Sequence, residues 1–252
     1  MVQLAELLEY TNKLLEIDRY QDYGPNGLQV EGKPQINKII SGVTASRALI
    51  DAAIAAQADA ILVHHGYFWK GEDPCLTGMK GDRIRRLIKA DLSLLAYHLP
   101  LDAHAELGNN ARLASLLGIT TEGRFIGDAE TGIGMHGSLP ESMSGAALAA
   151  HISEVLGREP LYIAGSDRPI KRIAWCSGGA QGYIQQALAL GVDAYITGEV
   201  SEHTVHTARE CGIHFFSAGH HATERYGVQA LGEHLANKFA VSHQFIDIDN
   251  PV

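Results

Sequence analysis

Apolar residues recur at two spacings along the chain, and the alternation between these spacings predicts an α/β fold. Residues 4–15 carry leucines at helical spacing with acidic residues between them, which is typical of an amphipathic helix. Short apolar runs at 39–43, 60–63 and 92–97 are separated by stretches with helical spacing. A strand, a helix and a second strand joined in this way form a right-handed βαβ unit with parallel strands. The pattern therefore predicts mixed or parallel sheets flanked by helices.

This pattern occurs twice in the chain. Residues 38–66 and 172–200 align without a gap at a constant offset of 134, and an Asp-Ala pair at 59–60 matches one at 193–194. Alanine-rich α/β segments can look alike by chance, but a shared Asp-Ala pair followed by matched apolar runs favours a true internal duplication. The glycine-rich stretch 122–144 is expected to be the changeover between the two halves.

The duplication predicts two α/β lobes. We expect the first lobe to comprise residues 1–124 together with 217–252, and to carry most of the polar residues described below. The second lobe is expected to comprise residues 125–216, which include the second copy of the repeat.

The charge balance limits the classes of partner. The net charge is −9, the sequence pI is about 5.8, and no run of Lys or Arg exceeds two residues. Binding to a nucleic-acid polymer is disfavoured, because it needs a basic surface that neutralises phosphates. Charged residues make up 19% of the chain, below the roughly 25% usual for soluble domains. This low fraction is typical of a chain whose surface is partly covered by other subunits.

Cysteines and apolar stretches indicate the compartment. Cys75, Cys176 and Cys211 are far apart and form no CxxC pair, so neither a disulfide framework nor a thiolate zinc site is indicated. The first residues form an amphipathic pattern rather than a signal peptide, and no segment approaches the roughly 18 apolar residues of a membrane span. We expect a cytoplasmic protein without a membrane segment.

Histidines and carboxylates follow three of the predicted strands. One pair comes directly after the run that ends at 63, a second group lies in HLPLD at 98–102, and a third lies in GHHATE at 219–224. Ligands of open parallel sheets gather outside the carboxyl ends of the strands. Each of these three groups follows the carboxyl end of a predicted strand. The residues concerned are His64, His65, His98, Asp102, His220 and Glu224.

These residue types predict a metal site. His220 and Glu224 are four residues apart at the start of a predicted helix, which puts both side chains on one helical face. Imidazoles combined with carboxylates suit Zn, Mn, Fe(II), Co or Ni rather than calcium. Apart from His98, the five candidate ligands are too many for one tetrahedral ion and suit two ions that share a carboxylate. Some of the thirteen histidines are neighbours by chance, and surface or core roles are assigned to His136, His151, His234 and His243.

Long motifs in the chain also resemble a known family. YGPNGLQVEG at 23–32, ILVHHGYFWKG at 61–71, HLPLDAHAELGNN at 98–110 and AGHHATER at 218–225 are similar to the GTP cyclohydrolase I type 2 homologues, the YbgI-like dinuclear metal proteins. The resemblance runs from about Tyr23 to the C-terminus. It implies two intertwined α/β domains in a toroidal homohexamer with two divalent ions per chain.

The resemblance also implies how the ligands are shared. One ion would be held by His65, Asp102 and Glu224, and the other by His64, His220 and Glu224. The name of the family is a weak guide to the substrate. The established GTP cyclohydrolase I enzymes hold zinc with two cysteines and a histidine, whereas none of the three cysteines here lies in a ligand loop.

Three functions remain open. The leading hypothesis is a metal-dependent hydrolase of a small molecule, such as a purine nucleotide or a damaged nucleotide, in which metal-bound water attacks. The alternatives are a metal-dependent scaffold or regulator without turnover, and a protein that handles metal ions themselves. His98 is either a general acid or base or a hydrogen-bond partner of Asp102.

Further residues have open roles near the predicted ions. Glu199 and His203 could orient ligands from the second lobe. Trp69 could stack on a base and Lys70 could meet a phosphate, although the aromatic residues of this loop could equally pack between subunits.

Overall fold

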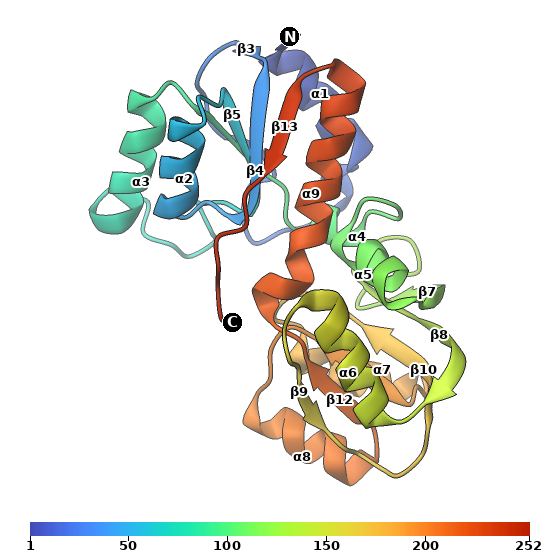
Figure 1. The fold of residues 1–252 in the computed structure, drawn as a ribbon. Helices are drawn as coiled ribbons and strands as arrows, with labels where there is room; N and C mark the ends of the chain where they lie inside the picture. The colour runs from blue at the N-terminus through green and yellow to red at the C-terminus, as the bar shows by residue number, and fades with distance from the viewer. The chain divides into compact units, whose positions relative to one another are not determined.

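The computed structural model describes all 252 residues, which divide into two compact units. Unit 1 comprises Met1–Leu101 and Gly227–Asp249, and unit 2 comprises Asp102–Tyr226 and Asn250–Val252. Each unit has its own sheet with helices beside it (Figure 1). The predicted α/β class is confirmed, with mixed sheets in both units.

Unit 1 contains a five-stranded sheet in the order β13-β4-β5-β6-β2. Neighbouring strands are parallel except for β2, which runs antiparallel to β6. α2 (Arg47–Ala55) and α3 (Gly78–Lys89) lie on one side of the sheet, and α1 (Leu4–Leu14) lies on the other (Figure 1). The strands are β2 (Gly27–Val30), β4 (Lys38–Thr44), β5 (Ala60–His65), β6 (Ser93–Ala96) and β13 (Ser242–Phe245).

The strands of unit 1 are apolar because helices cover both faces of the sheet. Ile61 of β5 and Leu94 of β6 are fully buried against Leu49 of α2 and Leu87 of α3. α2 begins where the Ser46 hydroxyl oxygen accepts a hydrogen bond from the Leu49 amide at 3.2 Å, as an N-cap does. Among the buried polar side chains of β5, His64 lies at the carboxyl end of the strand.

Unit 2 contains a six-stranded sheet in the order β7-β8-β10-β11-β12-β9. The three strands β10, β11 and β12 are parallel, and the remaining pairs are antiparallel. The strands are β7 (Thr120–Phe125), β8 (Gly134–Met143), β9 (Leu161–Ile163), β10 (Ile170–Trp175), β11 (Ala194–Thr197) and β12 (His214–Ser217). The helices are α5 (Asn109–Leu117), α6 (Gly145–Leu156), α7 (Ile184–Ala189) and α8 (Glu202–Cys211).

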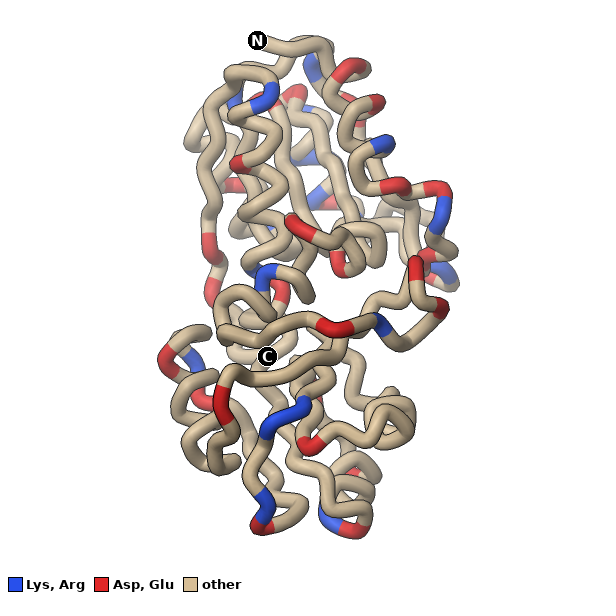
Figure 2. The backbone as a smooth tube through the Cα atoms, turned by 90° about the vertical axis from the view of Figure 1, so that its right-hand side faces the viewer, with Lys and Arg blue, Asp and Glu red and all other residues tan.

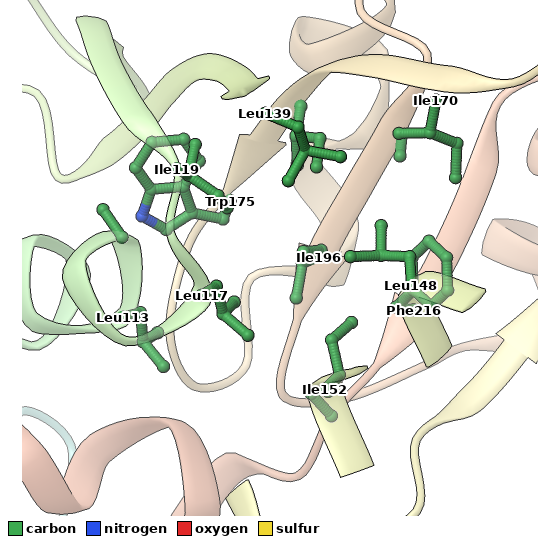
Figure 3. Packing of buried hydrophobic residues seen from close by; sticks show 14 of the residues in the cluster. Leu113, Leu117, Ile119, Leu139, Leu148, Ile152, Ile170, Trp175, Ile196 and Phe216 are labelled. Atoms are coloured by element: carbon green, nitrogen blue, oxygen red, sulfur yellow. The ribbon is translucent and has the colours of Figure 1, made fainter. Parts of the chain in front are cut away.

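The main core of unit 2 packs α5 and α6 against one face of its sheet. Trp175 of β10 and Leu113 of α5 belong to this core, in which Figure 3 shows Ile152 of α6 near Ile196 of β11 and Phe216 of β12. All of these side chains are at most 2% exposed. Because the core is continuous from α5 to β12, residues 109–117 belong to unit 2.

The internal duplication is visible in the strand register. Ile39 of β4 pairs with Ala60 of β5, and Ile173 of β10 pairs with Ala194 of β11, which keeps the offset of 134. The matched aspartates also make the same contacts. One carboxylate oxygen of Asp59 accepts hydrogen bonds from the amides of residues 37 and 38, and one of Asp193 accepts them from the amides of 171 and 172.

The unit boundaries differ from those expected from the sequence. The chain passes between units at 101/102 and 226/227, where the expected divisions were 124/125 and 216/217. The earlier boundary moves because α5 packs into the unit 2 core. The later one moves because α9 (His220–Phe239) begins in unit 2 and ends in unit 1.

The glycine-rich stretch 122–144 is more regular than a changeover loop. Most of it forms the end of β7 and the ten-residue strand β8. Gly137 lies where a side chain would overlap the Thr120 carbonyl oxygen, so glycine here permits the close approach of β7 and β8.

The remaining elements are short. They are β1 (Val2–Gln3), η1 (Ile17–Arg19), β3 (Gln35–Ile36), α4 (Leu99–Ala103) and η2 (Gln181–Tyr183). None of the helices combines the length and the apolar character needed to cross a membrane. Along each unit, basic residues are scattered among acidic ones (Figure 2). That the protein does not bind a nucleic-acid polymer stays a prediction, which is based on its charge.

Candidate metal centre

The carboxyl ends of β5 and β6 place three histidines of unit 1 together. His64 and His65 end β5, and His98 follows β6. The ring centroid of His64 lies 4.7 Å from that of His65 and 5.0 Å from that of His98. The three possible ligand nitrogens lie within 4.8 Å of one another. The adjacent residues His64 and His65 therefore keep their rings close enough together to reach the same ion.

His64 is held in one tautomer by the backbone. Its side chain is fully buried, and Nδ1 lies 2.9 Å from the Tyr97 carbonyl oxygen. A carbonyl oxygen only accepts, so Nδ1 carries the hydrogen and a neutral His64 has its lone pair on Nε2. The neighbouring His65 has its Nδ1 3.2 Å from the Thr44 hydroxyl. Both rings are therefore oriented through Nδ1, as metal-binding histidines usually are.

His98 is oriented by a residue that the sequence did not point to. Its Nδ1 donates to Asp22 Oδ1 at 2.7 Å. The other oxygen of Asp22 accepts hydrogen bonds from the Asn26 side chain and the Leu99 amide, both at 2.9 Å. Burial alone would raise the pKa of Asp22, but the hydrogen bond and charge of His98, together with these other donors, lower it. A hydrogen bond to Asp102 was one of the two roles considered for His98; the hydrogen-bond partner of its Nδ1 in the structure is Asp22.

The inserted loop after β5 covers this cluster with an indole ring. Trp69 is half-buried, with its centroid 5.1 Å from that of His98 and 6.2 Å from that of His65. A side chain at Gly24 would lie 3.1 Å from the Trp69 ring, so glycine there lets the loop pack closely. A cavity of about 10 Å³ remains beside these residues, which is about the space of one water. Lys70 is exposed next to Trp69.

In unit 2, Asp102 is buried and held by two polar side chains. Its Oδ1 accepts hydrogen bonds from Asn109 Nδ2 at 2.8 Å and from Ser177 Oγ at 2.9 Å. Ser177 follows β10, and its amide donates to Asn110 Oδ1. Because both side-chain donors reach the same oxygen, they fix the plane of the carboxylate. The sequence analysis gave no sign of the role of Ser177, because its partner Asp102 is 75 residues distant along the chain.

His220 and Glu224 lie on one face of the first turn of α9, as their spacing predicts. His220 Nε2 is 3.2 Å from Glu224 Oε2, and His220 Nδ1 is 2.7 Å from Glu199 Oε1. A carboxylate oxygen of Glu224 lies within 4.8 Å of one of Asp102. Glu199 therefore orients a candidate ligand, as expected, whereas His203 is exposed on α8.

The carboxylates around His220 change its protonation. Burial lowers the pKa of His220, but the hydrogen bonds and charges of Glu224 and Glu199 outweigh burial and raise the pKa to about 9. Without a metal, His220 is thus protonated at neutral pH. A metal ion would replace that proton, since only the neutral ring ligates.

Gly178 brings the backbone of unit 2 against the same two side chains. Its φ is +67°, and an added Cβ would overlap Glu224 Oε1 and lie 3.1 Å from His220 Nε2. Its amide donates to the Thr223 hydroxyl at 3.0 Å. Glycine is required here both for the left-handed conformation and for space.

The two units present their polar residues at equivalent positions. Residue 65 of the first repeat corresponds to residue 199 of the second at the offset of 134, and both lie at the carboxyl end of a central parallel strand. In unit 1 this position carries a histidine, and in unit 2 it carries a glutamate that binds a histidine. The duplication has therefore kept the place of the site while its chemistry diverged.

Comparison with known proteins identifies the family. Residues 2–251 match the sequence model of the Duf34/NIF3 (NGG1p interacting factor 3) family. The chain belongs to this family. Proteins with similar sequences include a Pseudomonas aeruginosa protein named GTP cyclohydrolase 1 type 2 homolog, 60% identical over 250 residues and 99% of both chains. A protein of the same name from Allochromatium vinosum is 54% identical over 252 residues, covering 100% of this chain and 98% of that one.

Solved structures agree with this assignment to the Duf34/NIF3 family. The protein ybgI, described as of unknown function, is 50% identical with a TM-score of 0.96 over 100% of both chains. A protein from Thermus thermophilus is 32% identical with a TM-score of 0.90, also over 100% of both chains. The resemblance seen in the sequence motifs is confirmed.

The donors in each unit fit a divalent transition metal. Unit 1 offers imidazoles whose Nδ1 atoms face fixed partners, and unit 2 offers one imidazole and two buried carboxylates. Imidazole nitrogen with carboxylate oxygen suits Zn and its neighbours in the first transition row. Other histidines serve elsewhere: His234 contacts the Tyr10 hydroxyl and His243 contacts that of Ser41.

Proposed function

We propose that the protein holds two divalent metal ions and uses them to hydrolyse a small molecule. The proposed ligands are His64, His65, Asp102, His220 and Glu224. The observation that carries the proposal is that these candidates are oriented by neighbouring groups. His64 and His220 each direct Nδ1 to an oxygen acceptor, and Asp102 is held by Asn109 and Ser177. Such support is typical of metal ligands and raises their basicity.

Glu224 is the proposed shared ligand. It would bind both ions, one with His65 and Asp102 and the other with His64 and His220. Its position supports this, because it is 2% exposed and, within unit 2, lies near both His220 and Asp102. A buried carboxylate carries a desolvation cost, which His220 offsets in part and which two cations would offset further.

The residues beside the ions carry the rest of the proposed chemistry. When bound, two divalent ions lower the pKa of a water molecule and stabilise developing negative charge on the substrate. Asp22 keeps the hydrogen of His98 on Nδ1, so Nε2 of a neutral His98 is the atom that can accept a proton. Trp69 packs against His98 and limits the access of bulk water to it.

The substrate we propose is a small molecule of the purine-nucleotide class, including damaged nucleotides. The name of the relatives, GTP cyclohydrolase 1 type 2 homolog, supports this class. The half-buried Trp69 offers a ring for stacking and the adjacent exposed Lys70 offers a cation for a phosphate. We further propose a cytoplasmic protein, since its three cysteines are free thiols, which suits a reducing compartment.

Metal analysis combined with an activity screen tests the proposal. Protein reconstituted with Zn, Mn, Fe(II), Co or Ni is assayed against phosphoesters, purine nucleotides and amides. We expect about two ions per chain and turnover with at least one metal and one substrate class. Glu224→Ala should lose most of both ions, whereas Glu233→Ala, an exposed glutamate on the same helix, should lose neither. A measurement of one ion or none per chain in the unaltered protein would contradict the two-ion proposal.

Substitution of His98 distinguishes the proposed hydrolase from a scaffold without turnover. His98→Ala should keep most of the metal and lose about 10²–10⁴-fold in rate, the usual contribution of a positioned acid or base. Asp102→Ala should instead lose metal and activity together. Wild-type turnover in His98→Ala would contradict the acid–base role while leaving the metal site intact.

The second candidate function is a metal-dependent scaffold or regulator without turnover. The family description, NGG1p interacting factor 3, favours it because it names an interaction rather than a reaction. This candidate predicts two bound ions, no turnover of any panel substrate, and unchanged partner binding in His98→Ala. For either function we propose a toroidal homohexamer.

A further inference from the structure

The three histidines of unit 1 have the spacing of a complete metal site. Their ring centroids are 4.7, 5.0 and 5.7 Å apart. Three imidazoles on one tetrahedral ion, each with a metal–nitrogen distance of about 2.0–2.1 Å, have ring centroids about 5 Å apart. Their possible ligand nitrogens also lie within 4.8 Å of one another. His64, His65 and His98 could thus hold an ion with modest rotations of their side chains.

All three rings direct the same nitrogen away from the cluster. Nδ1 of His64 faces the Tyr97 carbonyl oxygen, Nδ1 of His65 faces the Thr44 hydroxyl, and Nδ1 of His98 faces Asp22. The nitrogen that each ring offers to a ligand is therefore Nε2. This arrangement matches metal-binding histidines, which usually donate their second nitrogen to an oxygen atom.

His98 has the most strongly built support of the three. The Asp22 side chain is only 3% exposed, and both of its oxygens are used. The His98 amide is also held, since it donates to Asn26 Oδ1 at 2.7 Å. A buried carboxylate behind an imidazole makes the ring a better donor to a cation. A role only in packing would not need this arrangement.

We propose that His64, His65 and His98 form a loading position that takes up the first divalent ion with unit 1 residues alone. This inference rests on the proposed function and adds a sixth ligand to it. Three neutral imidazoles leave the charge of the ion uncompensated, whereas Asp102 and Glu224 supply negative charge. The ion therefore moves to the carboxylates once the centre is complete, and His98 is released to its role in proton transfer.

A variant that lacks every proposed ligand of unit 2 tests the loading position. The triple substitution Asp102→Ala, His220→Ala, Glu224→Ala is titrated with Co²⁺, and binding is followed by equilibrium dialysis and visible absorption. We expect about one Co²⁺ per chain with the absorption of a nitrogen-ligated ion. Adding His98→Phe should abolish this binding. Adding His234→Phe, a half-buried histidine of unit 1 outside the cluster, should leave it unchanged.

Two further measurements test the loading position, one in the triple variant and one in the otherwise unaltered protein. Asp22→Asn in the triple variant should weaken Co²⁺ binding by about 10–100-fold, as loss of a group behind a ligand does. In the otherwise unaltered protein, the first equivalent of Co²⁺ should bind more slowly when His98 is replaced by Phe. Circular dichroism confirms the fold of each variant.

The outcomes distinguish this inference from the proposed function. If the triple variant binds no Co²⁺, or binds it equally well with and without His98, the loading position is overturned. The two-ion centre would still stand if the unaltered protein binds two ions per chain. An unaltered protein that binds no metal would overturn both.

Discussion

Asp59 shows at the residue scale how a buried carboxylate stabilises the start of a strand. It accepts amide hydrogen bonds at the beginning of β4 and a hydrogen bond from Lys33 Nζ at 3.0 Å. Burial alone would raise the pKa of Asp59, but these donors and the charge of Lys33 lower it below the ordinary value. Since the ionised form is preferred in the folded state, ionisation of Asp59 stabilises the fold.

Replacing Asp59 should therefore give a pH-dependent loss of stability. We expect Asp59→Ala to lower the free energy of unfolding by about 1–3 kcal/mol at pH 7, because buried amides lose their acceptor. The ionic part of this difference is present above the unfolded pKa of about 3.9 and disappears as pH falls through the lowered folded pKa. Urea unfolding between pH 3 and pH 7 measures it. The exposed Asp249→Ala should behave like the unaltered protein throughout.

Ser177 offers a second test at the residue scale. Its hydroxyl holds Oδ1 of Asp102, so Ser177→Ala frees the carboxylate to rotate without removing a ligand. We expect metal affinity to fall by about 10–100-fold with little change in stability. Isothermal titration with Zn²⁺ measures the affinity, and Ser115→Ala on the exposed face of α5 is the control. Equal affinities for both variants would show that Ser177 does not support a ligand.

At the scale of elements, the start of α9 and the turn after β10 depend on each other. Gly178 lies against Glu224 and His220, and its amide is held by Thr223, so the turn and the helix fix one another. A helix start that carries two proposed ligands four residues apart needs this support, because the first turn of a helix frays most easily. The turn after β10 thus positions two proposed ligands that it does not itself supply.

Substitution of two glycines allows the effect of backbone strain to be measured apart from the effect of crowding. Gly178 and Gly157 have nearly the same φ, +67° and +66°, but a side chain at Gly157 meets no atom within 4 Å. Both Gly→Ala variants should lose about 1–2 kcal/mol from the left-handed conformation. Only Gly178→Ala should also lose metal, since its Cβ would displace Glu224. Thermal unfolding and elemental analysis of both variants test this, and equal metal contents would contradict it.

The sequence predicted the strands of the repeat and the residues at their ends. His64 and His65 could be recognised because they close an apolar run, and His220 with Glu224 because helical spacing joins them. Asp22 could not be recognised in this way. Its partner His98 is 76 residues distant, and only the folded loop before β2 brings the two together.

The unit boundaries also could not be predicted from the local sequence pattern. α5 has an ordinary amphipathic sequence that could serve either lobe, and its packing against Trp175 decides the matter. Periodicity shows that a helix has an apolar face, but it does not show which sheet that face covers.

At the scale of the whole molecule, the hexamer is the main expectation. The chain mass is 27.2 kDa, and we expect light scattering to give about six times this value across micromolar concentrations. The low charged fraction and the family resemblance motivate the expectation. A mass near 27.2 kDa at every concentration would refute it.

The place of β13 at the edge of the unit 1 sheet has a consequence for synthesis on the ribosome. β4 lies between β5 and β13, yet 197 residues separate the end of β4 at Thr44 from the start of β13 at Ser242. Most of unit 2 is translated in one continuous stretch before β13 leaves the exit tunnel. Until then β4 has an open edge, which other strands could join. A truncated chain that ends near residue 230 and has left the ribosome should therefore protect unit 2 from protease while unit 1 is still cleaved.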